Sequence, residues 1–335
     1  MNKLKYHVFI GIIAGFLFTT SCKKDEDQPT PNVNESEVLA SFLESDASPY
    51  GKDYVNTDMA SIVSAADVRQ LTLTGQVYII DIRSAADFAD GHIEGAMNVP
   101  FGQILDHIKG INHESYEKVV VVCYGGQSAS YATSLLRLMG YNNVWSMGFG
   151  MASWNEVFSG PWTNAISNAY QSQFTSDISP KAEKGEMPEL NTSKTTGIEI
   201  LEERLDALLD AGFTPCGITA QAVFDNLSSF YVVNYWPEAQ YIDPGHIPGA
   251  VQYTPKQSIK LATDLKTLPT DKPIAIYCYT GQGSGFLSAY LRLLGYDARS
   301  VMFGGSAMIY DMLSEREMPR FTNGAIQDYP YVSSK

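Results

Sequence analysis

The segment VVVVCYGGQSAS, at residues 119–130, joins an apolar run to a cysteine and then to a glycine-rich turn. The segment IAIYCYTGQGSG, at residues 274–285, repeats this order around a second cysteine. A short apolar run that stops at turn residues is typical of a buried strand. We therefore expect Cys123 and Cys278 each at the carboxyl end of a strand, with a loop of small residues and a helix after it.

The two segments belong to a longer internal repeat. After the cysteines, YGGQSASYATSLLRLMGY matches YTGQGSGFLSAYLRLLGY. Before them, DGHIEGAMNVP at residues 90–100 matches PGHIPGAVQYT at residues 244–254. The repeat predicts two domains of one type, at residues 55–160 and 213–325.

Strands and helices alternate within each predicted domain. In the first domain, strands are predicted at 77–82, 119–122 and 143–146, and helices at 64–72 and 128–139. Apolar strands interleaved with helices are typical of a parallel sheet that is covered on both faces. We expect an α/β fold in which each domain is a small parallel sheet flanked by helices, with ligands bound at the carboxyl ends of the strands.

The segments outside the repeat have less regular compositions. Residues 161–212 are predicted as a linker, because their first part is rich in Ser, Thr, Asn, Lys and Pro, and they end in an amphipathic helix at 198–211. Residues 23–54 are predicted as a charged, proline-containing tether, and residues 326–335 as a tail without a functional signal.

Residues 1–22 combine a positive start, a short apolar run and a cysteine. The apolar run is shorter than the roughly 20 residues that a membrane span needs, and it fits an export signal. The arrangement resembles a bacterial lipoprotein signal of the Bacteroidetes type, which implies a lipid anchor on Cys22. It departs from the common pattern at Thr19, where Leu is usual.

This resemblance implies an exported protein that is held at the bacterial cell envelope, on the periplasmic or surface face of the outer membrane. An ordinary cleaved signal, with Cys22 incidental, is the alternative.

Composition excludes some functional classes. The chain has 335 residues, of which 44% are hydrophobic, so it can form large buried cores. Its net charge of −14 argues against binding to nucleic acid. The four cysteines lack the spacing of zinc ligands, and we expect neither a metal nor a cofactor. Two disulfides are conceivable, although a chain of this length does not need them.

The two cysteine loops have the features of a reactive site. A thiolate is the nucleophilic form of cysteine. Glycines allow successive backbone N–H groups to turn inward, and the start of the following helix adds positive partial charge. Such a loop can hold a thiolate or persulfide without a cation. A buried structural cysteine is the alternative, and it explains two equivalent positions poorly.

These motifs together resemble tandem members of the rhodanese family of sulfurtransferases. The resemblance covers most of residues 55–325 and implies a cysteine that receives sulfane sulfur from a small donor and passes it to a thiol acceptor. Both Cys278 and Cys123 are expected to be catalytic, with Cys278 slightly favoured. The expected substrate-binding loops are Tyr124, Gly125, Gly126, Gln127 and Ser128 in the first domain, and Tyr279, Thr280, Gly281, Gln282, Gly283 and Ser284 in the second.

Neither loop contains Arg or Lys, so binding of dianionic thiosulfate is expected to be weak and a persulfide or polysulfide donor is favoured. The alternative functions are a non-catalytic persulfide carrier or redox sensor, and a phosphatase-like enzyme. The six-residue loop and the missing arginine disfavour the phosphatase.

Several polar residues are interpreted as structural support. Arg83 is predicted to pair with Asp87, because the second repeat lacks both charges. Asp81 precedes this pair, and Asn234 replaces it in the second repeat. His92 and His246 are expected to bond to backbone and hold their loops closed; a Cys–His pair with the nearby thiol is the alternative.

Cys216 has no counterpart in the first repeat and is interpreted as incidental. A resolving role toward Cys278 is the alternative.

Overall fold

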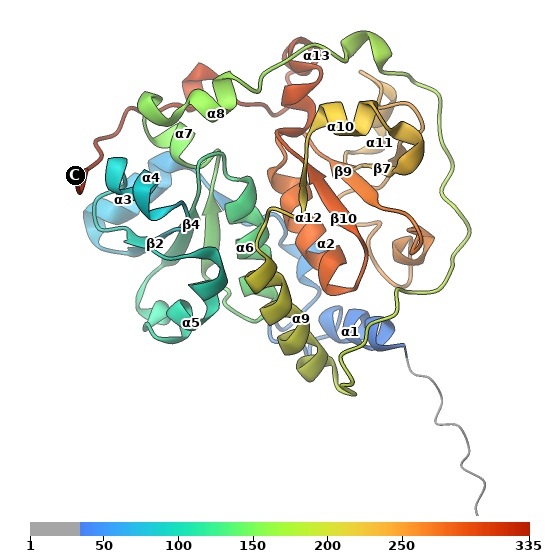
Figure 1. The fold of residues 1–335 in the computed structure, drawn as a ribbon, viewed down its shortest axis with the longest axis horizontal. Coiled ribbons are helices and arrows are strands. Elements are labelled where there is room, and N and C mark those ends of the chain that lie inside the picture. The colour runs from blue at the N-terminus through green and yellow to red at the C-terminus, as the bar shows by residue number, and fades with distance from the viewer. Residues whose placement is uncertain (1–33) are drawn as a thin grey trace, which may run out of the picture. The chain divides into compact units, whose positions relative to one another are not determined.

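The apolar strands of each repeat assemble into a five-stranded parallel sheet in the computed structural model, which describes residues 34–335 (Figure 1). The strand orders are β1-β5-β4-β2-β3 and β6-β10-β9-β7-β8, so the two domains have the same topology. The predicted α/β fold with two parallel sheets is confirmed. The strands are β1 Ile62–Val63, β2 Val77–Asp81, β3 Met97–Asn98, β4 Lys118–Val122, β5 Val144–Met147, β6 Gly217–Ile218, β7 Tyr231–Asn234, β8 Val251–Gln252, β9 Ile274–Tyr277 and β10 Ala298–Val301.

Helices flank the two sheets. The α-helices of the described residues are α1 Glu35–Leu43, α2 Tyr54–Thr57, α3 Ala65–Thr74, α4 Ala85–Asp90, α5 Ile104–Lys109, α6 Gln127–Leu138, α7 Met151–Trp154, α8 Gly160–Thr163, α9 Gly197–Ala211, α10 Ala220–Phe224, α11 Glu238–Ile242, α12 Gln282–Leu293 and α13 Tyr310–Glu315. Within residues 34–335, none of these helices has the length and apolarity that crossing a membrane would require.

The central strands explain why both cysteines lie at one edge of their sheets. In β4 the four valines from Val119 to Val122 are fully buried, as expected for a strand covered on both faces. β4 pairs in parallel with β2, which places Val122 opposite Asp81. Parallel strands end at the same edge, so the segments that follow β2 and β4 meet there.

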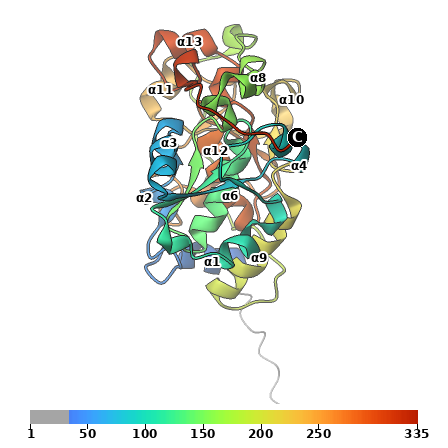
Figure 2. The ribbon, with the colours of Figure 1, turned by 90° about the vertical axis from the view of Figure 1, so that its left-hand side faces the viewer.

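Helices α6 and α12 join the two domains. Each follows a cysteine loop, and the two pack against each other near the centre of the described region (Figures 1 and 2). Leu135 in α6 and Phe286 in α12 are fully buried, and the hydroxyl of Ser134 donates to the carbonyl of Phe286 at 2.9 Å. The two cysteine loops therefore lie beside the domain interface.

The predicted tether is wrong for residues 34–54. Asn34 caps α1, and Leu39, Ala40 and Leu43 are buried in the main core. The hydroxyl of Ser36 also donates to the carbonyl of Leu294 at 2.7 Å. The rest of that prediction, the signal at 1–22 and the lipidated Cys22 lie outside the described residues.

The predicted tail also makes specific contacts. Val332 forms an antiparallel bridge with His92, and the indole of Trp154 donates to the carbonyl of Pro330 at 2.9 Å. Residues 326–335 therefore hold the end of the chain against the first domain, where Figure 1 places the C-terminus.

The linker between the domains starts and ends with packed elements. Trp162 in α8 is fully buried against Phe149 and Phe303, one from each domain. The amphipathic segment predicted at 198–211 is helix α9, and it packs against α1.

Candidate active site

Cys123 lies between the end of β4 and the start of α6. Gly126 has φ 86° and ψ −13°, a left-handed conformation that glycine adopts without strain, and it turns the chain back over the cysteine. The backbone N–H of Gly126 donates to Cys123 Sγ at 3.1 Å, and that of Ala129 donates at 3.4 Å. Two backbone N–H groups are therefore directed at the sulfur of Cys123.

In each domain a second glycine segment, at residues 148–151 or 303–305, hydrogen-bonds to the cysteine loop. The N–H of Met151 donates to the carbonyl of Cys123 at 2.8 Å, and the N–H of Gly305 donates to that of Cys278 at 2.9 Å. A Cβ atom on Gly150 or Gly304 would lie 2.3 Å from these same carbonyls. Both glycines are therefore required by close backbone approach, which explains why this motif repeats.

The hydrogen bonds of Cys278 differ from those of Cys123. The N–H of Ser284 donates to Cys278 Sγ at 3.3 Å, while the thiol donates to the hydroxyl of Ser284 at 3.7 Å. Ser284 stands where Ala129 stands in the first loop. The hydroxyl of Ser284 thus gives the Cys278 thiol a hydrogen-bond acceptor that has no counterpart at Ala129.

A cavity of about 370 Å³ lies beside Cys123. The first domain contributes charged and hydroxyl groups to it, and the second domain contributes apolar side chains. The residues that line it are Ile82, Arg83, Ser84, Asp87, Cys123, Tyr124, Gly125, Gln127, Ser128, Pro161, Phe213, Met302 and Phe303. Cys278 is absent from this lining.

The surroundings of the second loop are more aromatic. Trp236 is fully buried and stacks on Tyr279, with ring centroids 5.2 Å apart. The hydroxyl of Tyr279 donates to the side chain of Gln240. In the first domain the corresponding ring, Tyr124, instead faces the guanidinium of Arg83 at 4.9 Å. The second domain has therefore exchanged a cation for an indole.

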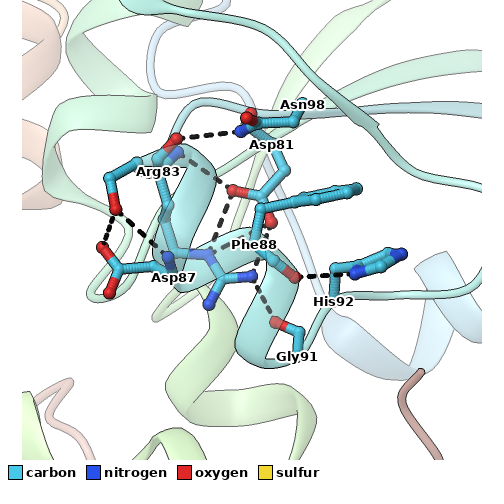
Figure 3. A network of polar contacts seen from close by, with 8 residues as sticks. Asp81, Arg83, Asp87, Phe88, Gly91, His92 and Asn98 are labelled. Atoms are coloured by element: carbon cyan, nitrogen blue, oxygen red, sulfur yellow. Dashed lines mark hydrogen bonds and ion pairs between the residues drawn. The ribbon is translucent and has the colours of Figure 1, made fainter. Parts of the chain in front are cut away.

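Arg83 pairs with Asp81, and the predicted pairing with Asp87 is wrong (Figure 3). The Nη2 atom of Arg83 lies 2.6 Å from Asp81 Oδ2, and both side chains are 1% exposed. The same nitrogen donates to the carbonyl of Gly91 at 2.7 Å. Arg83 therefore connects the end of β2 to the Gly-His-Ile loop.

Asp87 is held by a different set of contacts. The hydroxyl of Ser84 donates to its carboxylate at 2.6 Å. Hydrogen bonds from Ser84 and Tyr124 lower the pKa of Asp87, with a smaller contribution from the charge of Arg83. Asp87 is accordingly a carboxylate at neutral pH, and it lines the Cys123 cavity.

His92 and His246 both bond to backbone carbonyls, as predicted. His92 Nδ1 lies 2.7 Å from the carbonyl of Phe88, and the imidazole stacks on the Phe88 ring. His246 places Nδ1 2.8 Å from the carbonyl of Tyr241 and Nε2 2.9 Å from that of Asp177. Since carbonyls occupy both of its ring nitrogens, His246 is not available as a base for Cys278.

Each of the two loop glutamines contacts the backbone of the other domain. The N–H of Phe149 donates to Gln282 Oε1 at 2.9 Å, and Gln282 Nε2 lies 3.5 Å from the carbonyl of Gly126. In the other direction, Gln127 Nε2 lies 3.5 Å from the carbonyl of Thr280. Gln282 therefore supports the loop of Cys123 from the second domain.

Sequence reasoning missed the apolar lining of the cavity, chiefly Phe213, Met302 and Phe303. The sequence signal that could have indicated this lining is the phenylalanine that both repeats carry, at Phe149 and Phe303. Both have φ of 59°, which is rare for a residue with a side chain and marks a constrained position.

Cys216 is a free, buried thiol. Burial raises its pKa to about 11, so it is protonated at neutral pH. Cys123 and Cys278 are also free. Across residues 34–335, His, Cys, Asp and Glu form no group of three that could hold a metal ion.

The rhodanese-like domain family matches this chain twice, at residues 64–157 and 227–308. Over 95 residues the chain is 35% identical to the thiosulfate sulfurtransferase GlpE of Shewanella oneidensis, an alignment that covers 28% of this chain and 92% of that protein. The corresponding protein of Pseudomonas aeruginosa is 30% identical over 102 residues, with 30% and 90% covered.

Among solved structures, the thiosulfate sulfurtransferase from Pseudomonas aeruginosa aligns with 89% of this chain and 71% of its own, at 14% identity and a TM-score of 0.28. The two segments matched by the family make up more than half of the sequence. The chain belongs to the rhodanese-like domain family.

Proposed function

We propose that this protein is a sulfurtransferase that carries sulfane sulfur on a cysteine persulfide, and that Cys123 is the residue that is loaded. The main support is the position of Cys123, whose sulfur accepts two backbone N–H groups at the edge of a cavity. The sequence favoured Cys278 slightly. The geometry favours Cys123, because the Cys278 thiol has an acceptor for its proton in Ser284.

The reaction requires two displacements. In the first, the Cys123 thiolate attacks the outer sulfur of a donor persulfide, the S–S bond of the donor breaks, and the donor leaves as a thiolate. With thiosulfate as donor, the leaving group is sulfite. In the second, an acceptor thiolate attacks the outer sulfur of the Cys123 persulfide, which releases the acceptor persulfide and restores the Cys123 thiolate. No net oxidation occurs.

The loop suits both states of the cysteine. The N–H groups of Gly126 and Ala129 point at the sulfur, and α6 begins at Gln127. These donors and the positive end of the helix stabilise an anion at this position. The anion is a thiolate before loading and a persulfide after it.

Three serine substitutions test the assignment. We expect Cys123→Ser to abolish transfer from a low-molecular persulfide to a thiol acceptor, since it removes the nucleophile. Cys278→Ser is expected to keep most of the activity, and the buried Cys216→Ser is the matched control. Full activity in Cys123→Ser would contradict the proposal. Full loss of transfer activity in Cys278→Ser, with activity kept in Cys123→Ser, would assign the reaction to the second domain.

We also propose that the protein is exported and anchored to the cell envelope through a lipid on Cys22. The support is the sequence pattern of residues 1–22 alone. Cys22→Ala is expected to move the protein from the membrane fraction to the soluble fraction of the cells that produce it. An unchanged distribution would contradict lipid anchoring.

A further inference from the structure

The Cys123 cavity combines one uncompensated carboxylate with apolar side chains. Apart from the reactive Cys123, only Arg83 and Asp87 among the residues that line it carry charges at neutral pH. The charge of Arg83 is neutralised by Asp81 at 2.6 Å, and that pair is buried. Among the described residues, Asp87 has no ion-pair partner within 4.0 Å; its carboxylate accepts from the hydroxyl of Ser84 and is also close to Tyr124. The cavity therefore has a net negative charge.

The remaining lining adds no positive charge. Gln127 and Ser128 are neutral, and Phe213, Met302 and Phe303 give the second-domain side an apolar surface. A dianion such as thiosulfate would meet the Asp87 carboxylate, and the cation of the lining, Arg83, is already paired with Asp81. A small organic persulfide would place its carbon chain on the apolar residues, and an ammonium group on it would be attracted to Asp87.

We propose that Asp87 is a specificity-determining residue, which selects the persulfide of a small aminothiol over thiosulfate and over persulfides that carry a carboxylate. This inference rests on the proposed function, because it concerns the donor that loads Cys123. The ammonium-bearing persulfide approaches with its outer sulfur toward the Cys123 thiolate. The S–S bond of the donor breaks, the sulfur stays on Cys123, and the free aminothiol leaves as its thiolate.

Two probes of similar length and opposite charge isolate this effect. They are the persulfide of cysteamine, with an ammonium group, and the persulfide of 3-mercaptopropionate, with a carboxylate. The measurement is the rate at which each probe loads one sulfur onto Cys123, followed by peptide mass spectrometry. We expect the wild type to prefer the cysteamine persulfide by about threefold to tenfold, the range for a partly exposed charge pair. Added salt is expected to reduce the preference.

The chain offers a closely matched control for Asp87. Asp67 accepts from the hydroxyl of Ser64 at 2.7 Å, in the first turn of α3, as Asp87 accepts from Ser84 in α4. Asp67 does not line the cavity. We expect Asp87→Asn to remove most of the preference and to raise the rate with thiosulfate, while Asp67→Asn keeps both unchanged. Asp87→Glu, which retains the charge, is expected to keep the preference.

The outcomes separate this inference from the proposed function. Equal loading from both probes in the wild type would overturn the selectivity, and that result does not depend on any variant folding. A preference that survives in Asp87→Asn would overturn the role of Asp87. Failure of every donor to load Cys123 would instead overturn the proposed function.

Discussion

Asp81 and Arg83 form a buried ion pair in the first domain, and the second domain has lost both charges together. The corresponding residues are Asn234 and Trp236, and both are fully buried. Losing one partner of a buried pair leaves an uncompensated charge, which costs much more than losing both. The joint replacement is what this coupling predicts.

Substitutions in the first domain can test this coupling. We expect Arg83→Met to lower the free energy of unfolding by about 3–5 kcal/mol, because Asp81 is left buried without its cation. The double variant Asp81→Asn/Arg83→Met should be clearly more stable than the Arg83→Met single variant. Urea denaturation of the four proteins in the cycle measures the coupling. Additive losses would contradict it.

The wrong pairing of Arg83 with Asp87 has a simple physical origin. Arg83 and Asp87 are four positions apart, a spacing at which side chains are neighbours only within a helix. Arg83 instead lies just after β2, which ends at Asp81, and its backbone N–H also donates to Asp81 Oδ1 at 3.0 Å. Helix α4 begins only at Ala85. The loss of charges in the second repeat therefore correctly indicated that Arg83 forms an ion pair, but it did not distinguish Asp81 from Asp87 as the partner.

Cys216 is predicted to be unreactive near neutral pH. Burial raises its pKa to about 11, so the thiol stays protonated below that value and lacks the nucleophilic thiolate. We expect iodoacetamide at about pH 8, on the native protein, to label Cys123 at least tenfold faster than Cys216, with peptide mapping as the readout. Labelling of Cys216 should rise as the pH approaches its pKa. Equal labelling at the lower pH would contradict a buried, protonated Cys216.

At the scale of elements, the strand–loop–helix unit was predictable from sequence because its signals are local. An apolar run, a cysteine, a left-handed glycine and a helix start follow one another within residues 119–130. The predicted helix at 128–139 is α6, Gln127–Leu138. The repeat then gave independent support for the same unit at α12.

Substitution of Gly126 tests how much the Cys123 loop depends on the left-handed backbone conformation at this position. A Cβ atom there would lie 2.5 Å from Gln282 Nε2, and its φ of 86° disfavours a side chain. Gly95 is a control with φ of 82° and open space around it. We expect Gly95→Ala to cost about 1 kcal/mol of unfolding free energy, and Gly126→Ala to cost more and to lower sulfur loading at least tenfold.

Equal effects of these two substitutions on both readouts would show that backbone strain alone matters. The close contact with Gln282 would then have no role in forming the Cys123 loop.

At the scale of the whole molecule, the decisive contacts join residues that no local pattern connects. Trp162 packs between Phe149 and Phe303, stacks on Phe321 and donates to the carbonyl of Gly125 at 3.2 Å. The sequence placed Trp162 in a linker, since single-chain patterns carry no information about which distant side chains fill the same core. The packed segments 34–54 and 326–335 were missed for the same reason.

These contacts predict that the two domains unfold together. We expect a single calorimetric transition, because α6, α12 and Trp162 bury apolar surface shared by both sheets. Trp162→Ala should lower the free energy of unfolding by about 3–5 kcal/mol, the usual cost of truncating a buried aromatic residue. Two separated transitions in the wild type would contradict a shared core.

The central claim is that Cys123 carries the transferred sulfur. The most direct measurement is mass spectrometry of the protein after brief exposure to a persulfide donor, with peptide mapping of the extra sulfur. The account predicts one added sulfur on the peptide that contains Cys123, and wild-type loading of that peptide in Cys278→Ser. An added sulfur confined to Cys278, or no stable adduct on Cys123 under any donor, would contradict it.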